Sequence, residues 1–389
     1  MWKKSATVEF KTDFRPPTAF DDTRQLQALM LESVEHNVSD VFFQVGNPVL
    51  AKINGSMHQM THERLTVGEV EQILGWACGS AVQAAGIQQG KEVRTSYSVQ
   101  HPTREDAFRS RLRYRFRVNA VRGEFRNAVS AQIVMRSIAS EPATVEEVGL
   151  EPELIEAMAP KDGCCWMTGA TGSGKSKTIG AQIRHVCEGD TAIKGNILTL
   201  ESPIEAVYDN VASSHSVVHQ VEVYRDIPSF HDGLVAFMRM NPSLIVVGET
   251  RDEPTSSAAL EAAETGHTVL STLHANNCAS IPSRLLSFYP PEHRESMLFQ
   301  VIDTARVFCN QRLVLNKEGN GRLALREFLV LDADMRDHII RTADPIRLTS
   351  VLRDFVRTKG RTFRESAERA YENGLISGAT VDEYRSANG

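Results

Sequence analysis

The sequence has no long apolar run. None of its segments approaches the roughly 18 consecutive apolar residues that a membrane-spanning helix needs. The first residues, MWKKSATVEFKTDF, carry charges but no apolar core, so we expect no signal peptide. These absences predict a cytoplasmic protein, with any membrane association limited to the membrane surface.

Cysteine pairs of the CxxC type are also absent. Cys164 and Cys165 are adjacent, and the other four of the six cysteines are scattered. This pattern excludes a structural zinc site of the four-cysteine kind and favours reduced thiols in or near the core.

An excess of positive charge is lacking as well. The chain has 43 Lys and Arg against 49 Asp and Glu, a formal net charge of -6, so we expect no direct nucleic-acid binding through a global basic field. One segment, RSRLRYRFRVNAVRG, is locally basic, and alternation on a strand would place its odd-numbered arginines on one face. A solvated face, a nucleic-acid groove and arginines that reach a neighbouring subunit's phosphates all fit the pattern. The arginines concerned are Arg109, Arg111, Arg113, Arg115, Arg117 and Arg122.

The 389 residues suffice for two or three domains. The first part has apolar residues at helical spacing over 23–37 and in TVGEVEQILGWACG, and strand-like segments in SDVFFQVG, in PVLAKING and across 92–138. This mixture predicts an α+β domain built on an antiparallel sheet. After SEPATVEEVGLEPELIEAMAP the short apolar strands GCCWMTG, NILTLE, SLIVVGE and HTVLSTLH alternate with helical segments. That alternation predicts a parallel sheet with helices on its faces, followed by a helical tail.

The segment GATGSGKS matches the phosphate-binding loop pattern G-x-x-x-x-G-K-[ST], with a strand before it and a helical pattern after it. The glycines allow backbone N–H groups to surround phosphates, and the helix start favours anions. We expect Lys175 to reach the β- and γ-phosphates of ATP and the Ser176 hydroxyl to ligate Mg²⁺. The predicted nucleotide-binding residues here are Gly169, Ala170, Thr171, Gly172, Ser173, Gly174, Lys175, Ser176 and Lys177.

Carboxylates follow two further predicted strands. Glu201 and Glu205 follow NILTL, and Glu249 comes directly after Gly248 at the end of SLIVVG. In an open parallel sheet such residues lie at the ligand-binding edge, and we expect Gly248 to allow close backbone approach. We predict that Glu249 orients the attacking water and contacts Mg²⁺ directly or through water, with a contribution from Glu201. Each of these glutamates taken alone is also compatible with a solvated surface side chain.

Two histidines flank the strand TVLSTL. His267 precedes it and His274 follows it, and a histidine near the γ-phosphate can report its charge by a hydrogen bond. We therefore include His267 among the nucleotide-binding residues and His274 among the catalytic ones. Another pair, His215 and His219 in HSVVH, lies on a strand-like pattern and is interpreted as structural.

Together GATGSGKS, LESPIE, IVVGETRD and AAETGHTVLSTLHAN resemble, in order and spacing, the Walker A loop, Asp box, atypical Walker B and His box of the secretion ATPases. The resemblance runs over roughly residues 25–385 and is strongest to the DotB/TraJ branch of type IVB secretion and conjugation systems. It implies a PAS-like N-terminal domain, a RecA-like ATPase domain and a homo-hexameric ring. It also implies ATP and Mg²⁺ as cofactors, with ATP bound between the two domains.

Carried over to this sequence, the resemblance matches Glu201 to the Asp-box acid and Glu249 to the Walker B acid. It matches Arg117 and Arg136 to arginines that face the phosphates, which adds them to the catalytic candidates. Ser202 and Ala170 depart from the pattern of the pilus-retraction ATPases, and VLRDFVRTKGR only approximates their AIRNLIREGK motif. The division of labour between Glu201 and Glu249 stays open, as does the choice of arginines that act in trans.

These observations predict a lead-in over 1–22, a PAS-like domain over 23–140, a linker over 141–150, a RecA-like P-loop ATPase domain over 151–346 and a helical tail over 347–389. The predicted function is MgATP hydrolysis that powers substrate transfer or assembly in a type IVB secretion or conjugation system. The expected partners are other secretion-system ATPases and coupling-complex proteins at the inner membrane's cytoplasmic face. The alternatives are a type IV pilus retraction motor and a nucleotide-gated scaffold that does not hydrolyse ATP.

Overall fold

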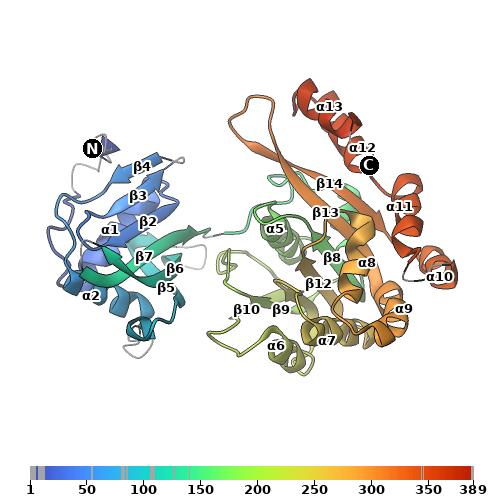
Figure 1. Cartoon of the computed structure of the whole chain (residues 1–389), viewed down its shortest axis with the longest axis horizontal. Coiled ribbons are helices and arrows are strands. Elements are labelled where there is room, and N and C mark those ends of the chain that lie inside the picture. Colours follow the sequence, from blue (N-terminus) through green and yellow to red (C-terminus); the bar gives the residue numbers. More distant parts are fainter. Residues whose placement is uncertain are drawn as a thin grey trace. The chain divides into compact units, whose positions relative to one another are not determined.

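The computed structural model describes residues 6–7, 14–53, 56–79, 84, 86–105, 110–125, 128–139, 141–342, 344 and 346–386. The chain forms two compact units, Met1–Glu141 and Pro142–Gly389 (Figure 1). Arg109 and half of the predicted lead-in lie outside the described residues.

The first unit is built on an antiparallel sheet with the order β1-β4-β3-β2-β7-β6-β5, in which only the short β1 runs parallel to its neighbour. Its strands are β1 (Ala6–Thr7), β2 (Asp40–Gln44), β3 (Leu50–Ile53), β4 (Ser56–Gln59), β5 (Val93–Glu105), β6 (Arg111–Phe125) and β7 (Ala128–Ile138). Its helical segments are α1 (Thr23–Glu35), α2 (Val67–Cys78) and the 3-10 turn η1 (Gly86–Gln89).

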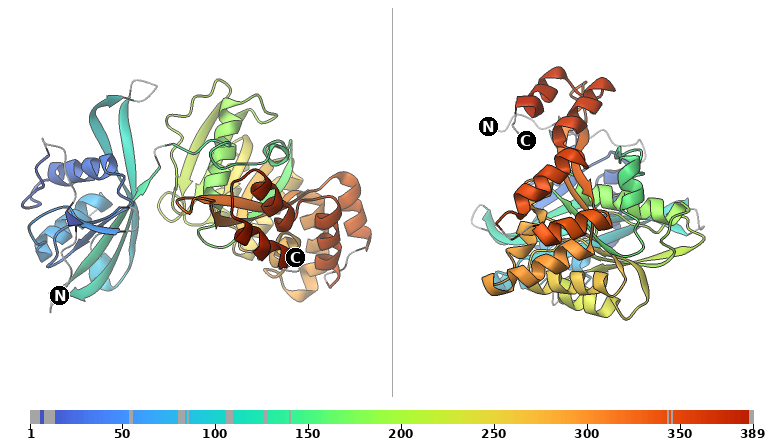
Figure 2. Two further views of the ribbon diagram at one scale, coloured as in Figure 1. Left: turned by 90° about the horizontal axis from the view of Figure 1, so that it is seen from above. Right: turned by 90° about the vertical axis from the view of Figure 1, so that its right-hand side faces the viewer.

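Helices α1 and α2 lie on one face of this sheet (Figure 2). Along β6 the even-numbered residues Tyr114, Phe116 and Val118 are buried in the core shared with the helices. Alternation then places the intervening arginines on the opposite face, which confirms the predicted pattern for the part of the basic segment that the structure describes.

The second unit contains the parallel sheet. Its strands are β8 (Gly163–Thr168), β9 (Gly195–Glu201), β10 (Ser216–Glu222), β11 (Pro242–Val247), β12 (Thr268–Leu273), β13 (Ala305–Leu315) and β14 (Arg322–Val330). Its helical segments are α4 (Pro152–Ala157), α5 (Lys175–Glu188), α6 (Phe230–Phe237), α7 (Glu253–Glu264), η2 (Cys278–Ser280), α8 (Ile281–Leu286), η3 (Pro291–His293), α9 (Arg294–Thr304), α10 (Ala333–Thr342), α11 (Leu348–Thr358), α12 (Phe363–Glu372) and α13 (Gly378–Ser386).

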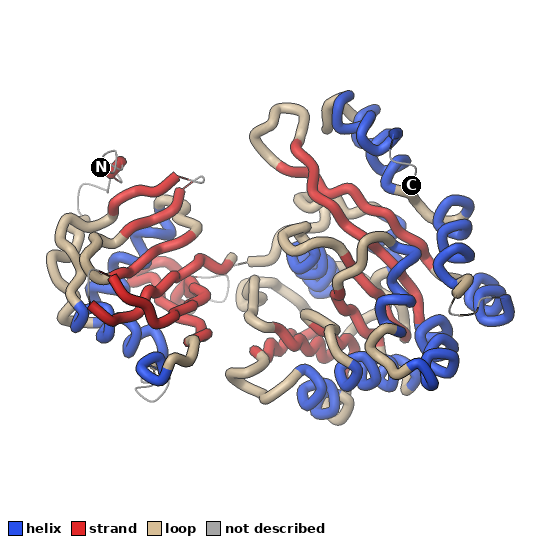
Figure 3. Tube along the Cα trace, viewed as in Figure 1, coloured by secondary structure: helices blue, strands red, loops and turns tan. Residues whose placement is uncertain are grey.

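The strand order is β10-β9-β11-β12-β8-β13-β14, parallel throughout except for the antiparallel pair β13–β14. β8 and β12 are buried along their whole length, as their continuous apolar sequences predict. Helices flank the sheet (Figure 3). One core cluster joins α5 and α4 to the sheet, and another joins it to α6 through α11.

The predicted fold class is confirmed by this architecture: an antiparallel α+β unit, a parallel-sheet α/β unit and a helical C-terminal tail. The hairpin β13–β14 was not predicted from composition or periodicity. All six cysteines are free, and five of them are buried. Within the described residues no helix is long and apolar enough to cross a membrane.

The segment predicted as a linker over 141–150 packs within the second unit. Val145 and Leu150 are buried in the same cluster as Ile179 of α5 and Cys165 of β8. Apolar side chains at these two positions attach the segment to the second unit, so it is not a free connection.

Candidate nucleotide-binding site

Four parallel strands end at one edge of the second unit's sheet. Residues 169–176 follow β8, Glu201 ends β9, Gly248 and Glu249 follow β11, and His274 follows β12. Because the carboxyl ends of parallel strands share an edge, these segments converge there. They surround a pocket of about 440 Å³.

Most of the predicted nucleotide-binding and catalytic residues of this unit line that pocket. They are Thr171, Gly172, Ser173, Gly174, Lys175, Ser176, Lys177, Glu201, Glu205, Glu249 and His274, and Gly248 lines the pocket beside them. The other two predicted loop residues, Gly169 and Ala170, contact Lys175 through their carbonyl oxygens.

Lys175 lies folded back onto the phosphate-binding loop. Its Nζ donates to the carbonyl oxygens of Gly169 and Ala170 at 2.8 and 3.1 Å. Burial lowers the pKa of Lys175, and the nearby negative charges of Glu249 and Glu205 act in the opposite direction. The loop thus holds a partly desolvated ammonium group, which attracts an anion, near two carboxylates that repel one.

His274 joins Lys175 to Glu249. Its Nδ1 lies 3.2 Å from the same Gly169 carbonyl oxygen that Lys175 contacts, and its Nε2 lies 3.6 Å from Glu249 Oε1. The ring therefore spans from the loop to the carboxylate, with one nitrogen facing each of them. The Gly169 carbonyl oxygen therefore contacts both Lys175 and His274, and His274 in turn faces Glu249.

Two glycines are required by the close packing at this edge. Gly169 has φ 141°, and a Cβ there would lie 2.3 Å from the carbonyl oxygen of Gln311. A Cβ on Gly248 would lie 3.0 Å from the carbonyl oxygen of Leu200, which accepts a hydrogen bond from the Gly248 N–H at 2.7 Å. The close backbone approach predicted at Gly248 is confirmed.

Glu201 is held by neighbouring side chains. Its Oε1 accepts hydrogen bonds from Thr199 Oγ1 at 2.8 Å and from Gln220 Nε2 at 2.9 Å. Burial raises the pKa of Glu201, and these two hydrogen bonds partly offset that rise. Glu249 is more exposed, with 37% of its side chain accessible. The two acids line the same pocket but differ in their contacts: Glu201 is partly buried and held by two side-chain hydrogen bonds, and Glu249 faces His274.

The structure does not bring His267 to this site. It precedes β12, whereas His274 follows it, so the two histidines lie at opposite edges of the sheet, roughly 20 Å apart by the rise of a six-residue strand. His267 Nδ1 instead lies 3.1 Å from the carbonyl oxygen of Ala262 at the end of α7. Its inclusion among the nucleotide-binding residues is corrected to a local structural role.

Arg117 and Arg136 lie in the first unit, directly opposite each other on β6 and β7. Arg136 donates to Asp40 Oδ1 at 2.6 Å while 59% of its side chain stays accessible. Their predicted role toward the phosphates of a neighbouring subunit stays a prediction.

A buried polar network behind the loop was not found from the sequence. Gln311 Nε2 donates to the Ser173 carbonyl at 2.7 Å, and Gln311 Oε1 accepts from Thr178 Oγ1 at 2.9 Å and from Arg326 Nε at 2.8 Å. Arg326 is fully buried and pairs with Glu151 at 3.0 Å. Strands β13 and β14 thereby fix the loop and the start of α5. A glutamine and an arginine within strand patterns carry no sequence signal for such a role.

Comparison with known proteins gives the family. The family model described as "Type II/IV secretion system protein" matches residues 106–384. The chain belongs to this family. Members of the Type II/IV secretion system protein family among its relatives include the Type IV pilus ATPase PilU of Pseudomonas aeruginosa, which is 30% identical over 91% of this chain and 86% of its own length.

Solved structures of family members are similar over nearly the whole chain. The Legionella pneumophila ATPase DotB matches with a TM-score of 0.84 and 34% identity, covering 99% of this chain and 100% of that one. The pilus retraction motor PilT with bound ADP matches with a TM-score of 0.76 and 28% identity, covering 92% and 96%. The chain is accordingly a nucleotide-binding ATPase of the secretion and pilus motor family, as its four motifs predict.

Proposed function

We propose that this chain is an oligomeric motor ATPase of a type IVB secretion or conjugation system, in which MgATP hydrolysis powers substrate transfer or assembly. The observation that carries the proposal is the convergence of Lys175, Glu249 and His274 at one pocket beside the phosphate-binding loop. The likeness to DotB, which spans the whole of that chain, supports the choice of system.

In the proposed reaction Lys175 and the loop N–H groups bind the β- and γ-phosphates. Glu249, on the accessible side of the pocket, orients the attacking water and accepts its proton. His274, which lies between the loop and Glu249, donates a hydrogen bond to the γ-phosphate and so reports its presence. Glu201 orients the polar groups around it from its buried position.

The pocket suits Mg²⁺ of the P-loop type. Ser176 at the start of α5 and Glu249 across the pocket both line it, and hydroxyl and carboxylate oxygens are the donors that Mg²⁺ prefers. No group of three or more His, Cys, Asp or Glu side chains suited to a metal occurs among the described residues. P-loop sites need no such cage, because phosphate oxygens and water supply most ligands. When bound, the ion would neutralise charge that develops on the phosphates.

We further propose a hexameric ring at the cytoplasmic face of the inner membrane, with other secretion-system ATPases and coupling-complex proteins as partners. In this ring Arg117 and Arg136 of one subunit would face the phosphates bound by the next. A ring would make hydrolysis depend on assembly.

A second candidate is a pilus retraction motor. The relative PilU and the PilT structure favour it, and each covers nine-tenths or more of this chain. The approximate match of VLRDFVRTKGR to the retraction motif weighs against it.

Deletion of the gene from its own host separates the two. Loss of conjugative transfer or of protein translocation with unchanged twitching motility supports the secretion role. The converse pattern supports retraction. In each case complementation should require Lys175, since both machines depend on hydrolysis.

A further inference from the structure

A second pocket lies away from the nucleotide site, between the hairpin β13–β14 and the C-terminal helices. Its volume is about 620 Å³, within the usual range of small-molecule sites. Five of its lining residues are arginines: Arg312, Arg353, Arg357, Arg364 and Arg385. The chain has a formal net charge of -6, so this pocket is a locally positive region on a negatively charged protein.

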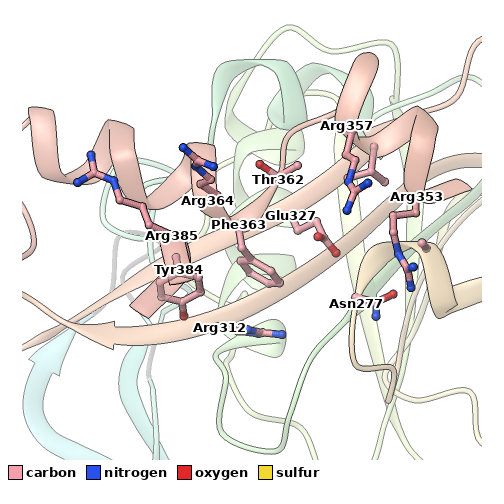
Figure 4. Close-up of a pocket in the computed structure, with 12 residues that line it drawn as sticks. Asn277, Arg312, Glu327, Arg353, Arg357, Thr362, Phe363, Arg364, Tyr384 and Arg385 are labelled. Carbon is pink, nitrogen blue, oxygen red and sulfur yellow. The ribbon is translucent and has the colours of Figure 1, made fainter. Parts of the chain in front are cut away.

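The arginines divide into two groups. Arg364 pairs with Glu368 at 3.1 Å, and Arg385 pairs with the same carboxylate at 3.3 Å. Within the described part of the chain, Arg312, Arg353 and Arg357 form no ion pair at 4.0 Å or less. Figure 4 shows Arg353 and Arg357 extending from α11 toward Glu327 and Asn277, whereas Arg364 and Arg385 point away from them.

One carboxylate lines the pocket with these arginines. Glu327 lines the pocket, and its Oε2 accepts a hydrogen bond from the Cys278 backbone N–H at 2.6 Å. Burial raises the pKa of Glu327, while the charges of Arg312 and Arg353 act against that rise. Even with Glu327 ionised, three guanidinium groups face one negative charge, so the pocket retains about two uncompensated positive charges.

The positions of these arginines are supported by their surroundings. Arg312 lies over the ring of Phe363, with its Cζ 4.3 Å from the ring centroid, and donates to the Asn276 carbonyl at 3.3 Å. Arg353 and Arg357 are one turn apart on the exposed side of α11, whose other side is fixed by buried Leu352 and Val356. The charges therefore come from two elements, a strand and a helix, on different sides of one cavity.

We propose that this pocket binds a small anion that carries phosphate groups. A tetrahedral phosphate accepts hydrogen bonds from several guanidinium groups at once, whereas a planar carboxylate matches a single arginine fork.

The pocket is connected to the nucleotide site by a short loop. Residues 274–278 begin with His274, which contacts the phosphate-binding loop, and end with Cys278, which donates to Glu327. Between them the carbonyl of Ala275 accepts from Asn310 Nδ2 at 2.8 Å, and the carbonyl of Asn276 accepts from Arg312. An anion that draws Arg312 or Arg353 from Glu327 thus acts on the loop that carries His274. This second part of the proposal rests on the proposed hydrolysis.

The binding test uses inorganic pyrophosphate and the Lys175→Ala protein, whose P-loop no longer competes for the probe. Calorimetry at constant ionic strength should show one pyrophosphate bound per chain. Adding Arg353→Gln and Arg357→Gln should weaken binding at least about tenfold, because hydrogen bonds to charged groups are lost. Arg353→Lys with Arg357→Lys should give an intermediate loss, and the control Arg341→Gln, at an exposed arginine of α10 outside the pocket, should leave binding unchanged.

Two results would overturn the proposal: no pyrophosphate binding to the Lys175→Ala protein, or equal binding after the two glutamine substitutions. Unchanged circular dichroism and thermal unfolding would show that those variants are folded. Binding of an octaglutamate peptide in place of pyrophosphate would assign the pocket to an acidic segment of a partner and would also reject the phosphate ligand.

The connection to His274 is tested in the otherwise unaltered protein by ATP hydrolysis at constant free Mg²⁺. Pyrophosphate should change kcat even at saturating ATP, and this change should disappear in the Arg353→Gln, Arg357→Gln protein. Purely competitive inhibition that is the same in both proteins contradicts the connection. A chain that hydrolyses no ATP at all would reject the proposed function and leave the calorimetric result standing.

Discussion

The Gly169 carbonyl oxygen is the atom that two functional side chains of the nucleotide site share as a contact. Lys175 and His274 both contact it, and His274 also faces Glu249. An ammonium group, an imidazole ring and a carboxyl group are thereby held around the place where we propose that phosphates bind. At this scale each side chain can be tested by itself.

Lys175→Ala should abolish hydrolysis and weaken ATP binding at least tenfold, because it removes the buried ammonium group that pairs with the phosphates. Nucleotide binding measured by calorimetry and phosphate release checks this. Lys194→Ala, at an exposed lysine paired with Asp190, is the matched control. Wild-type phosphate release by the Lys175→Ala protein would contradict the assigned site.

Glu249→Gln should leave ATP binding nearly unchanged and lower turnover by roughly 10²–10⁴-fold, the usual contribution of a positioned general base. The amide keeps the shape of the side chain but cannot accept the proton of water. Single-turnover hydrolysis with bound ATP is the measurement. Wild-type turnover in this variant would remove Glu249 from its role.

Glu201→Gln should change the pH dependence of stability. Burial raises the pKa of Glu201, so the folded protein keeps this proton at pH values where the unfolded chain has lost it. The free energy of unfolding therefore falls as pH rises through the raised pKa, and the loss is absent below the ordinary carboxyl range. The free energy of unfolding of the variant should exceed that of the wild type most near neutral pH, and this difference should shrink as pH falls.

Urea unfolding of both proteins at several pH values measures this difference. A difference that is constant with pH would mean that Glu201 does not titrate with a raised pKa. The neutral amide can still accept from Gln220 and Thr199, so the variant retains the local hydrogen bonds.

At the scale of elements, the hairpin β13–β14 supports the phosphate-binding loop, and the sequence alone did not predict this support. Strands β8 and β12 were predictable because their apolar runs are continuous, and the loop and carboxylates that follow them lie where parallel topology requires. Gln311 and Arg326 act across 138 and 175 residues of sequence, on Ser173 and Glu151, and periodicity carries no information on such contacts. His267 was misplaced because its motif was assigned as a whole, although its position before the strand already indicated the opposite edge.

Arg326→Met should lower the free energy of unfolding by about 3–5 kcal/mol. It removes the nearer of the two guanidinium partners of Glu151, and the carbonyls of Val148 and Gly149 lose their donor. It should also weaken ATP binding, because Gln311 loses one of its two donors behind the loop. Chemical denaturation and calorimetry give the two values. The control Arg341→Met, at an exposed pair with Asp337, should change stability by less than about 0.5 kcal/mol.

At the scale of the whole molecule, we propose that arginines on β6 and β7 of the first unit act on the nucleotide site of a neighbouring subunit in the ring. Their cross-strand pairing places Arg117 and Arg136 side by side on one face of the sheet. Light scattering with a non-hydrolysable ATP analogue should give six times the mass of one chain. A strict monomer with and without the analogue would remove the ring and the action in trans together.

Mixing two inactive proteins tests action in trans. Arg117→Ala retains the loop lysine, and Lys175→Ala retains the arginine, so a mixed ring contains interfaces with both groups intact. Hydrolysis should reappear on mixing and reach a fraction of the wild-type rate set by the proportion of the two chains. No recovery in rings shown to be mixed would place Arg117 outside the neighbouring site.

The packing of residues 142–150 determines where the ATPase unit can be cut from the chain. Val145 and Leu150 lie in its core, and the carbonyls of Val148 and Gly149 accept hydrogen bonds from buried Arg326. A fragment that starts at Glu151 would expose apolar surface and leave that guanidinium without two of its acceptors. A fragment that starts at Pro142 retains them all, so limited proteolysis should trim the isolated unit back to this point and no further.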